Sequence, residues 1–407
     1  MAGSATTGNA PTINMQGIDV PSTSVDANTF FANTRRKRFS EKSISQFAGL
    51  GQSDQFTIKQ SGIIAALDIH FTASVVVALN SGTVATTSRW PYDLLKKVIL
   101  SANGTTNLVS CSGAKLAAYR FIQEPNLNDR GIAQGIGGAS PGAVTNQGTL
   151  SLNSESWGLG QNVTAIPAGT YDVELYFRVP LAADLVKLLG AVFGQTQATS
   201  LNVELDYETQ GNLFTTTGSP TITFNNASVL CEGIVFSIPY GPDGNIVIPN
   251  LSAYHKFIQY NDFAVGAGAY GSTLVGQGVG QLLERVIWQL WNGSPSAPVP
   301  ITSANFGQLG WQYGGDQTPE TYNSNGVQKG HMLRFWMEDL YSTDLGAAGF
   351  ASLDFASQWL MRDAVDESTA TNLQALITPL VAITSPRLEV VQETISAGSG
   401  MYGSSGT

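Results

Sequence analysis

The chain has 407 residues, of which 43% are hydrophobic and only 12% are charged, and its formal net charge is -10. The length suits two domains, since one domain typically has about 100 to 200 residues. The net negative charge excludes a protein that binds nucleic acid over its whole surface, because phosphate binding needs a basic surface. The low charge has two interpretations that composition leaves open: a surface that faces other protein, or a surface of uncharged polar residues.

The cysteines and the apolar runs narrow the class further. Cys111 and Cys231 are too few for a disulfide framework and lack zinc-site spacing, so we expect buried free thiols. The first residues lack a basic segment followed by an apolar one, so we expect synthesis in a cytoplasm without a cleaved secretory signal. No uninterrupted apolar run of about 18 residues occurs, so no membrane-spanning helix is predicted.

Residues 1–50 are predicted to form an N-terminal arm. Its first part is rich in Ser, Thr, Asn and Gly, and then Arg35-Arg36-Lys37-Arg38 forms the densest positive charge of the protein. If this segment is helical, Phe31, Arg35 and Phe39 share one side. The four basic residues then suit an anionic surface such as a membrane. A solvated basic linker, or an arm that pairs with acidic neighbours, fits the sequence equally well.

Residues 51–240 read as a first β domain. Apolar and polar residues alternate in Leu67–Val75, Tyr171–Val179 and Leu201–Tyr207, which predicts strands with one face in a core. Between the last two, apolar residues at helical spacing in 181–193 predict a short helix. A further strand is predicted over residues 228–239.

The turn-forming residues 240–245 place a linker over 241–255 and a second β domain over 256–395. Strands of this second domain are predicted at residues 282–291, 332–341, 376–383 and 388–395. Residues 396–407 are rich in Gly and Ser and predict a flexible C-terminal arm. Long Gly-rich loops between the strands favour jelly rolls over a tight meander.

Motifs that could carry catalysis lack their structural context. Gly138–Gly142 matches the G-x-S-x-G pattern of hydrolases, but neither the strand before the serine nor the helix after it is predicted. Gly276–Gly280 lacks the lysine and the βαβ unit of a phosphate-binding loop. The three histidines lack metal-site spacing, and acidic neighbours such as Glu338 and Asp339 are typical of a solvated surface. We therefore expect no catalytic residues, no metal and no cofactor.

Several short segments resemble one known family. They occur in a fixed order, and they are Ala165–Thr170 with the strand after it, Val179–Ala182, Leu189–Val192, the strand from Leu201, Cys231-Glu232, the turn Gly241–Gly244 and Ile248-Pro249. This order resembles the major capsid protein of tectiviruses, the membrane-containing bacteriophages. The resemblance extends over roughly residues 55–255. The first 50 residues and the loop 131–147 depart from the family pattern, which leaves the contacts of the arm undetermined.

The resemblance implies an all-β fold, a double jelly roll of two eight-stranded β-sandwiches with short helices in its loops. It also implies a homotrimer of pseudo-hexagonal outline that tiles an icosahedral virion shell around an internal membrane and a DNA genome. Expected partners are neighbouring capsid trimers, penton and minor capsid proteins, and the membrane through the N-terminal segment, without specific nucleic-acid binding. A carbohydrate-binding or receptor-binding β-sandwich, such as a viral spike or a lectin, is the alternative. Tryptophans such as Trp288, Trp291, Trp311 and Trp336 are expected in cores or interfaces.

Overall fold

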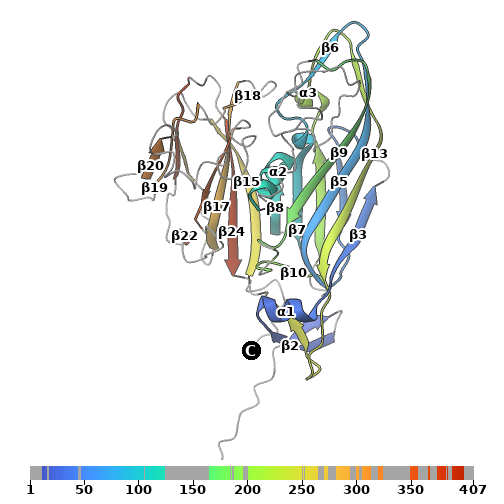
Figure 1. The fold of residues 1–407 in the computed structure, drawn as a ribbon, viewed down its shortest axis with the longest axis vertical. Coiled ribbons are helices and arrows are strands. Elements are labelled where there is room, and N and C mark those ends of the chain that lie inside the picture. Colours follow the sequence, from blue (N-terminus) through green and yellow to red (C-terminus); the bar gives the residue numbers. More distant parts are fainter. Residues whose placement is uncertain are drawn as a thin grey trace, which may run out of the picture.

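A computed structural model shows two groups of long strands side by side, with a helix between them (Figure 1). No helix among the described residues is long and apolar enough to cross a bilayer. The structure describes residues 12–15, 18–44, 47–104, 106–123, 165–183, 185, 188–195, 200–249, 251, 253–264, 270–273, 281–293, 299–301, 305–312, 320–323, 349–355, 365–366, 374–381, 383 and 387–397.

The first unit is a sandwich of two four-stranded sheets. One sheet has the order β3-β13-β5-β9, and the other has the order β4-β11-β7-β8. The strands are β3 (Arg36–Ile44), β4 (Ser53–Thr57), β5 (Ile63–Ala78), β7 (Leu95–Ala102), β8 (Thr106–Cys111), β9 (Gly169–Pro180), β11 (Leu201–Tyr207) and β13 (Thr221–Phe236).

Alternating burial in these strands follows from their sequence pattern. In β11, Leu201, Val203, Leu205 and Tyr207 are buried, and the polar residues between them are half-buried. In β5 the alternation holds from Asp68 onward, whereas Ile63 to Leu67 are all buried. This first stretch of β5 is covered on both faces, because it also packs against a second cluster that contains Phe30.

Short elements connect these strands. The helix α2 (Gly113–Gln123) follows β8, and the single-turn helices η1 (Tyr92–Leu94) and α3 (Gln210–Leu213) precede β7 and follow β11. At the end of the sandwich near α3, β6 (Thr83–Thr86) pairs with β12 (Phe214–Thr217). The two-residue β10 (Val192–Phe193) pairs with the start of β5.

The second unit repeats the arrangement. One sheet has the order β15-β24-β17-β21, with β18 and β22 also paired to β17, and the other has the order β16-β23-β19-β20. The strands are β15 (Ala253–Ala264), β16 (Tyr270–Thr273), β17 (Gln281–Asn292), β18 (Val299–Pro300), β19 (Gln308–Gln312), β20 (Glu320–Asn323), β21 (Phe350–Asp354), β22 (Val365–Asp366), β23 (Gln374–Thr378) and β24 (Arg387–Ala397).

The two units share the same strand topology. If the eight main strands of each unit are counted in chain order, one sheet runs 1-8-3-6 and its partner runs 2-7-4-5. This is the strand order of a jelly roll, in which two Greek keys fold into an eight-stranded sandwich. The prediction of two eight-stranded β-sandwiches with short helices in the loops is therefore confirmed.

The two rolls are joined edge to edge. β8 of the first roll pairs in parallel with β15 of the second at Val109↔Phe257 and Ser110↔Ile258, so one sheet of ten strands runs through both. The core of the first roll extends across this joint to Phe257, Ile287 and Val391 of the second roll. The second roll has its own core on the other face of β17 and β24, around Trp288.

A small substructure lies at one end of the first roll, beyond β3 and β10 (Figure 1). The strands β1 (Thr12–Met15), β2 (Ile18–Ser24) and β14 (Ile246–Ile248) form a three-stranded sheet beside the helix α1 (Ala27–Asn33). Asp26 caps α1 by accepting a hydrogen bond from the backbone N–H of Thr29 at 3.1 Å. Phe30 is fully buried and packs edge to face on Phe236, so α1 is anchored to the end of β13.

Several predicted boundaries differ from the structure. The arm predicted over residues 1–50 contains strands β1 and β2, helix α1 and all of β3, so the first roll begins at Arg36 and not at residue 51. The linker predicted over 241–255 contains β14 and the start of β15, and β24 extends into the predicted C-terminal arm as far as Ala397. In each case a strand extends beyond the predicted boundary because its backbone pairs with a strand far away in the sequence: β3 with β13, β14 with β2, and β15 with β24.

The short helix predicted within residues 181–193 is wrong for the residues described there. Val192 and Phe193 form β10 against Ile64 and Ile63, and no helix is described between Leu181 and Phe193. Leu188 and Phe193 are buried because they fill the cluster around Phe30, and Leu185 is partly buried against the same cluster. The strand predicted at residues 332–341 lies outside the described residues.

Candidate functional site

Helix α2 lies between the two rolls and contacts both of them. The backbone N–H of Ser112 donates to the side chain of Gln259 in β15 at 2.8 Å, which ties the start of the helix to the second roll. The helix begins at Gly113, where a Cβ atom would lie 2.2 Å from the carbonyl oxygen of Tyr92. The helix can therefore approach η1 this closely only with glycine at that position.

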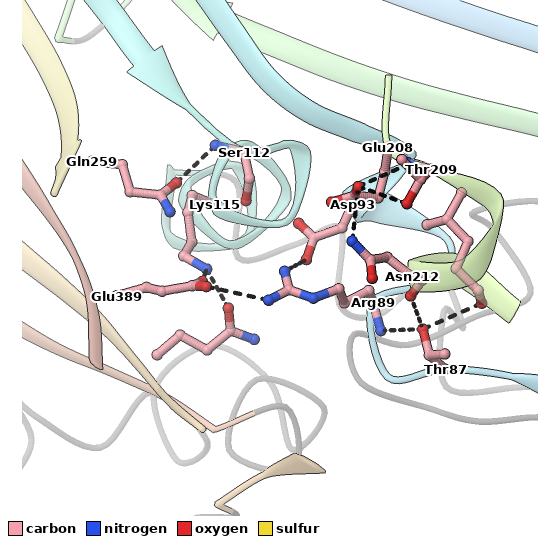
Figure 2. A network of polar contacts seen from close by, with 12 residues as sticks. Thr87, Arg89, Asp93, Ser112, Lys115, Glu208, Thr209, Asn212, Gln259 and Glu389 are labelled. Atoms are coloured by element: carbon pink, nitrogen blue, oxygen red, sulfur yellow. Dashed lines mark hydrogen bonds and ion pairs between the residues drawn. The ribbon is translucent and has the colours of Figure 1, made fainter. Parts of the chain in front are cut away.

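Lys115 crosses from α2 into the second roll. Its side chain is fully buried, and its ammonium group donates to the carboxylate of Glu389 in β24 and to the amide oxygen of Gln289 in β17 (Figure 2). The ammonium nitrogen also lies 5.4 Å from the centre of the Phe350 ring, within range of a cation–π contact. A buried lysine without such partners would be very costly, so these contacts define where the helix sits.

Arg89 approaches the same carboxylate from the first roll. Its guanidinium donates to Asp93 at 3.0 Å and lies 3.6 Å from Glu389 (Figure 2). It also stacks over the Trp291 ring at 5.1 Å. The buried carboxylate of Glu208 is a further charge that faces Arg89.

The pKa values of the carboxyl groups reflect this setting. Burial by itself would raise the pKa of Glu389, but the charges of Lys115 and Arg89 outweigh it and lower the pKa. Burial raises the pKa of Asp93, and its contact with Arg89 offsets only part of that rise. The two carboxyl groups that Arg89 contacts therefore have pKa values shifted in opposite directions.

A second buried network lies further along the same sheet. Glu393 of β24 accepts hydrogen bonds from the Tyr119 hydroxyl of α2 at 2.7 Å and from the Arg285 guanidinium of β17 at 2.9 Å. His255 of β15 lies 3.1 Å from the same carboxylate, and Arg285 also donates to Asp354 at 3.0 Å. Burial raises the pKa of Glu393, but the positive charge of Arg285 and the hydrogen bond with His255 lower it overall.

The two networks fix how the rolls meet. Replacing a buried ion pair by apolar residues is often neutral or stabilising, so such pairs are weak evidence for stability. They do restrict the arrangement of the rolls, because a buried donor is costly unless its acceptor lies at hydrogen-bonding distance. Lys115 and Tyr119, on one face of α2, select one orientation of the second roll, which the apolar surface around them would not specify alone.

Sequence reasoning missed these residues. Lys115 and Tyr119 are each 274 positions from their carboxylate partners, and no local motif relates them. The expectation of no metal site rests on the spacing of the histidines along the chain, and distant residues can still meet in space. His255 lies with Glu284 and Glu393 in a buried group that could hold a metal ion.

The four basic residues proposed to face a membrane occupy the edge of the first roll. Arg36, Lys37 and Arg38 belong to β3, which pairs antiparallel with β13, so this segment is a strand and not the helix considered from the sequence. All four residues are exposed. Arg38 differs from the other three, because its guanidinium pairs with Asp68 at 3.1 Å and Glu232 at 3.5 Å on the outer face of the sheet.

The outer face of this sheet carries a depression of about 270 Å³ whose lining includes Arg38, Asp68 and His70. Asp68 also accepts a hydrogen bond from Arg178 at 2.8 Å, and the His70 ring stacks on the Tyr176 ring at 4.2 Å. His70 lies 2.8 Å from Glu174 and is a half-buried member of this polar face.

Other predicted residues have mixed outcomes. Cys111 and Cys231 are buried free thiols, as predicted, and burial raises the pKa of both. Trp288 is in the second core and Trp291 is buried against Arg89 at the junction. The side chains of Trp311 and Trp336, and the segments 138–142 and 276–280, lie outside the described residues, as do the side chains of Glu338 and Asp339.

The fold is similar to solved structures of viral capsid proteins. One is the major capsid protein of Sulfolobus turreted icosahedral virus, with a TM-score of 0.57 and 13% identity over 91% of this chain and 99% of that chain. Another is the Faustovirus major capsid protein, with a TM-score of 0.53 and 10% identity over 89% and 90%. The PBCV-1 virus capsid has a TM-score of 0.51 and 12% identity over 90% and 95%.

No protein-family model matches the sequence, and no curated protein matches it significantly. At these identities the structural similarity establishes the fold alone. Together with the repeated strand order, it defines the chain as a double jelly roll.

Proposed function

We propose that the chain is the major capsid protein of an icosahedral virus, a structural subunit of the virion and not an enzyme. The main support is the pair of consecutive jelly rolls with one strand order, joined edge to edge by β8 and β15. Capsid proteins share this architecture over about nine-tenths of both chains. In this function the rolls form a rigid block, and its outer surfaces provide the contacts with other subunits.

The subunit assembles as a homotrimer in this proposal. Three chains with two rolls each place six similar sandwiches around one threefold axis, which gives a pseudo-hexagonal tile. A chain with only 12% charged residues suits extensive contact with other subunits. Native mass spectrometry of the purified chain is expected to show a trimer, and particle averages in electron microscopy a six-cornered outline. A chain that stays monomeric at micromolar concentration contradicts the proposal.

The wider assembly follows from the same function. Neighbouring trimers, penton and minor capsid proteins, and an internal membrane around a DNA genome are the partners of this subunit. Electron microscopy of the native particle tests all of them in one experiment. A particle without a lipid layer leaves the capsid function in place but removes the membrane from it.

The basic edge of the first roll is the part of this proposal that concerns lipid. Arg35, Arg36 and Lys37 are exposed beside α1, whereas Arg38 is engaged by two carboxylates. We propose that the first three residues face anionic head groups. Each basic residue close to an anionic membrane contributes about 1 kcal/mol to binding. The triple substitution to Ser is therefore expected to weaken flotation with phosphatidylserine liposomes at least about tenfold.

Lys96 and Lys97 provide the matched control. Both are exposed at the start of β7, which pairs with the last residues of β11 beside α3, at the end of the roll opposite α1 (Figure 1). Their substitution by Ser removes two positive charges, against three in the triple variant, and is expected to leave flotation unchanged. Equal losses in the two variants, or no loss in either, exclude a specific membrane-facing edge.

A further inference from the structure

A buried group of three metal-binding side chains lies at the roll junction. His255, Glu284 and Glu393 come from β15, β17 and β24, and β24 lies between the other two strands in the sheet. One ligand atom from each residue lies within 4.8 Å of the other two. The residues are only 1%, 3% and 1% exposed. No second group of this kind occurs in the described part of the chain.

A β-bulge brings Glu284 into this group. Val286, Trp288 and Leu290 of β17 face the core of the second roll, and regular alternation would turn Glu284 toward that core as well. The pairing of β17 with β24 shifts register between Leu283 and Arg285, and Leu283 takes the core position instead. The shift places Glu284 on the junction face with Arg285. Bulges commonly redirect a side chain in this way beside functional sites.

The charges at this position favour a bound cation. The carboxylates of Glu393 and Asp354 share the guanidinium of Arg285, and Glu284 adds a third carboxylate. Gathering carboxylates in a buried site is expensive unless positive charge compensates them. A divalent ion beside Glu284 and Glu393 would add to the compensation that Arg285 provides.

The donor set identifies the class of ion. Imidazole nitrogen with carboxylate oxygen suits zinc and related first-row transition ions, whereas calcium and magnesium prefer oxygen ligands throughout. Zinc lies about 2.0–2.2 Å from such ligands, and tetrahedral coordination then places two ligand atoms about 3.3–3.6 Å apart. The three ligand atoms lie within 4.8 Å of one another, so binding would draw them together by up to about an ångström through side-chain rotation.

We propose that His255, Glu284 and Glu393 bind a divalent transition ion of the Zn²⁺ class and that this ion clamps the roll junction. The ion would crosslink three neighbouring strands of the second roll. Glu393 also accepts the hydrogen bond from Tyr119 of α2, so the clamp would extend to the first roll. This role goes beyond shell formation and does not depend on it, because it concerns the isolated chain.

The first test uses the full-length chain without substitutions. After treatment with a chelator and addition of Zn²⁺, elemental analysis is expected to find about one ion per chain. The midpoint of thermal unfolding is expected to rise with Zn²⁺, because a ligand that binds only the folded state stabilises it. Ca²⁺ at the same concentration is expected to have little effect. Co²⁺ is expected to give the visible absorption of a nitrogen- and oxygen-ligated ion.

Two variants locate the ion. Glu284→Gln removes one charged ligand with little change of shape, and we expect it to weaken Zn²⁺ binding at least tenfold and to abolish the Zn²⁺-dependent rise in the unfolding midpoint. His70→Gln is the control, because His70 also lies beside a glutamate, 2.8 Å from Glu174, but on the polar outer face of the first roll. It is expected to bind Zn²⁺ as the unsubstituted chain does.

Two results overturn the proposal. One is an unsubstituted chain that binds less than about one-tenth of an equivalent of Zn²⁺ and unfolds at the same temperature with and without it. The other is a loss of binding in His70→Gln that equals the loss in Glu284→Gln, which would place the ion on the surface. The Co²⁺ spectrum of the unsubstituted chain keeps the test decisive if Glu284→Gln fails to fold.

Discussion

Lys115 offers the sharpest test of how the rolls are joined. Substitution by Met keeps most of the aliphatic length and removes the ammonium group that contacts Glu389 and Gln289. Removing one partner of a buried ion pair typically costs about 3–5 kcal/mol, because the other charge stays buried. Glu389 retains Arg89 at 3.6 Å, so we expect the lower end, about 3 kcal/mol.

Thermal and urea unfolding measure this loss. A cooperative unit of 150–250 residues changes its midpoint by about 2–4 °C per kcal/mol, so Lys115→Met is expected to unfold about 6–12 °C lower. Arg38→Met is the control. Arg38 also pairs with a carboxylate, but its side chain is 55% exposed, and exposed pairs contribute at most about 1 kcal/mol.

A double variant separates the ion pair from other effects. Lys115→Met combined with Glu389→Gln removes both charges, so no carboxylate is left buried without its lysine. We expect the double variant to lose at least about 1 kcal/mol less than the sum of the two single losses, as for contacting residues in general. Additive losses, or a cost of Lys115→Met no larger than that of Arg38→Met, would refute a junction held by this pair.

The remaining predictions concern the same elements. The charges of Lys115 and Arg89 lower the pKa of Glu389 from an ordinary 4.5 to about 2, so its ionised form stabilises the fold above pH 4.5 and this contribution disappears as the pH falls from 4.5 toward 2. Glu389→Gln is expected to flatten the acid side of a plot of unfolding free energy against pH, and an unchanged slope contradicts this. Gly113→Ala is expected to lower the unfolding midpoint, since its Cβ would collide with the Tyr92 carbonyl; a midpoint equal to that of the parent shows that α2 can move away without cost. Cys111 and Cys231 are expected to react with a thiol reagent only when the chain unfolds, because both are buried and burial raises their pKa; rapid labelling under native conditions would show that the rolls open.

Much of the strand content was predictable because it depends on local pattern. Tyr171–Val179 and Leu201–Tyr207 alternate strictly, and each occupies one of the observed strands. Leu282–Trp291 lies within β17, although its buried residues fill both faces. One face of β17 packs in the second core and the other contacts α2 and the core of the first roll, which explains why nearly all of its residues are buried.

Errors arose where spacing supported a helix but distant backbone pairing decided the structure. Phe31, Arg35 and Phe39 share a helix face by spacing, yet the chain from Arg36 pairs with β13. Residues 181–193 have helical spacing, yet Val192 and Phe193 pair with β5. In both cases the partner strand is far away in the chain, so periodicity within the segment contains no information about it.

The sequence by itself determined the class of fold, because alternation of apolar and polar residues along a strand states which face is buried. Only the tertiary structure decided that the two rolls share the sheet order 1-8-3-6 and 2-7-4-5 and that β8 lies beside β15. It alone also brought Lys115 to Glu389, and His255 to Glu284 and Glu393. The physical reason is that a buried charge selects its partner by position in space, and that position is fixed only when separate strands pair and pack.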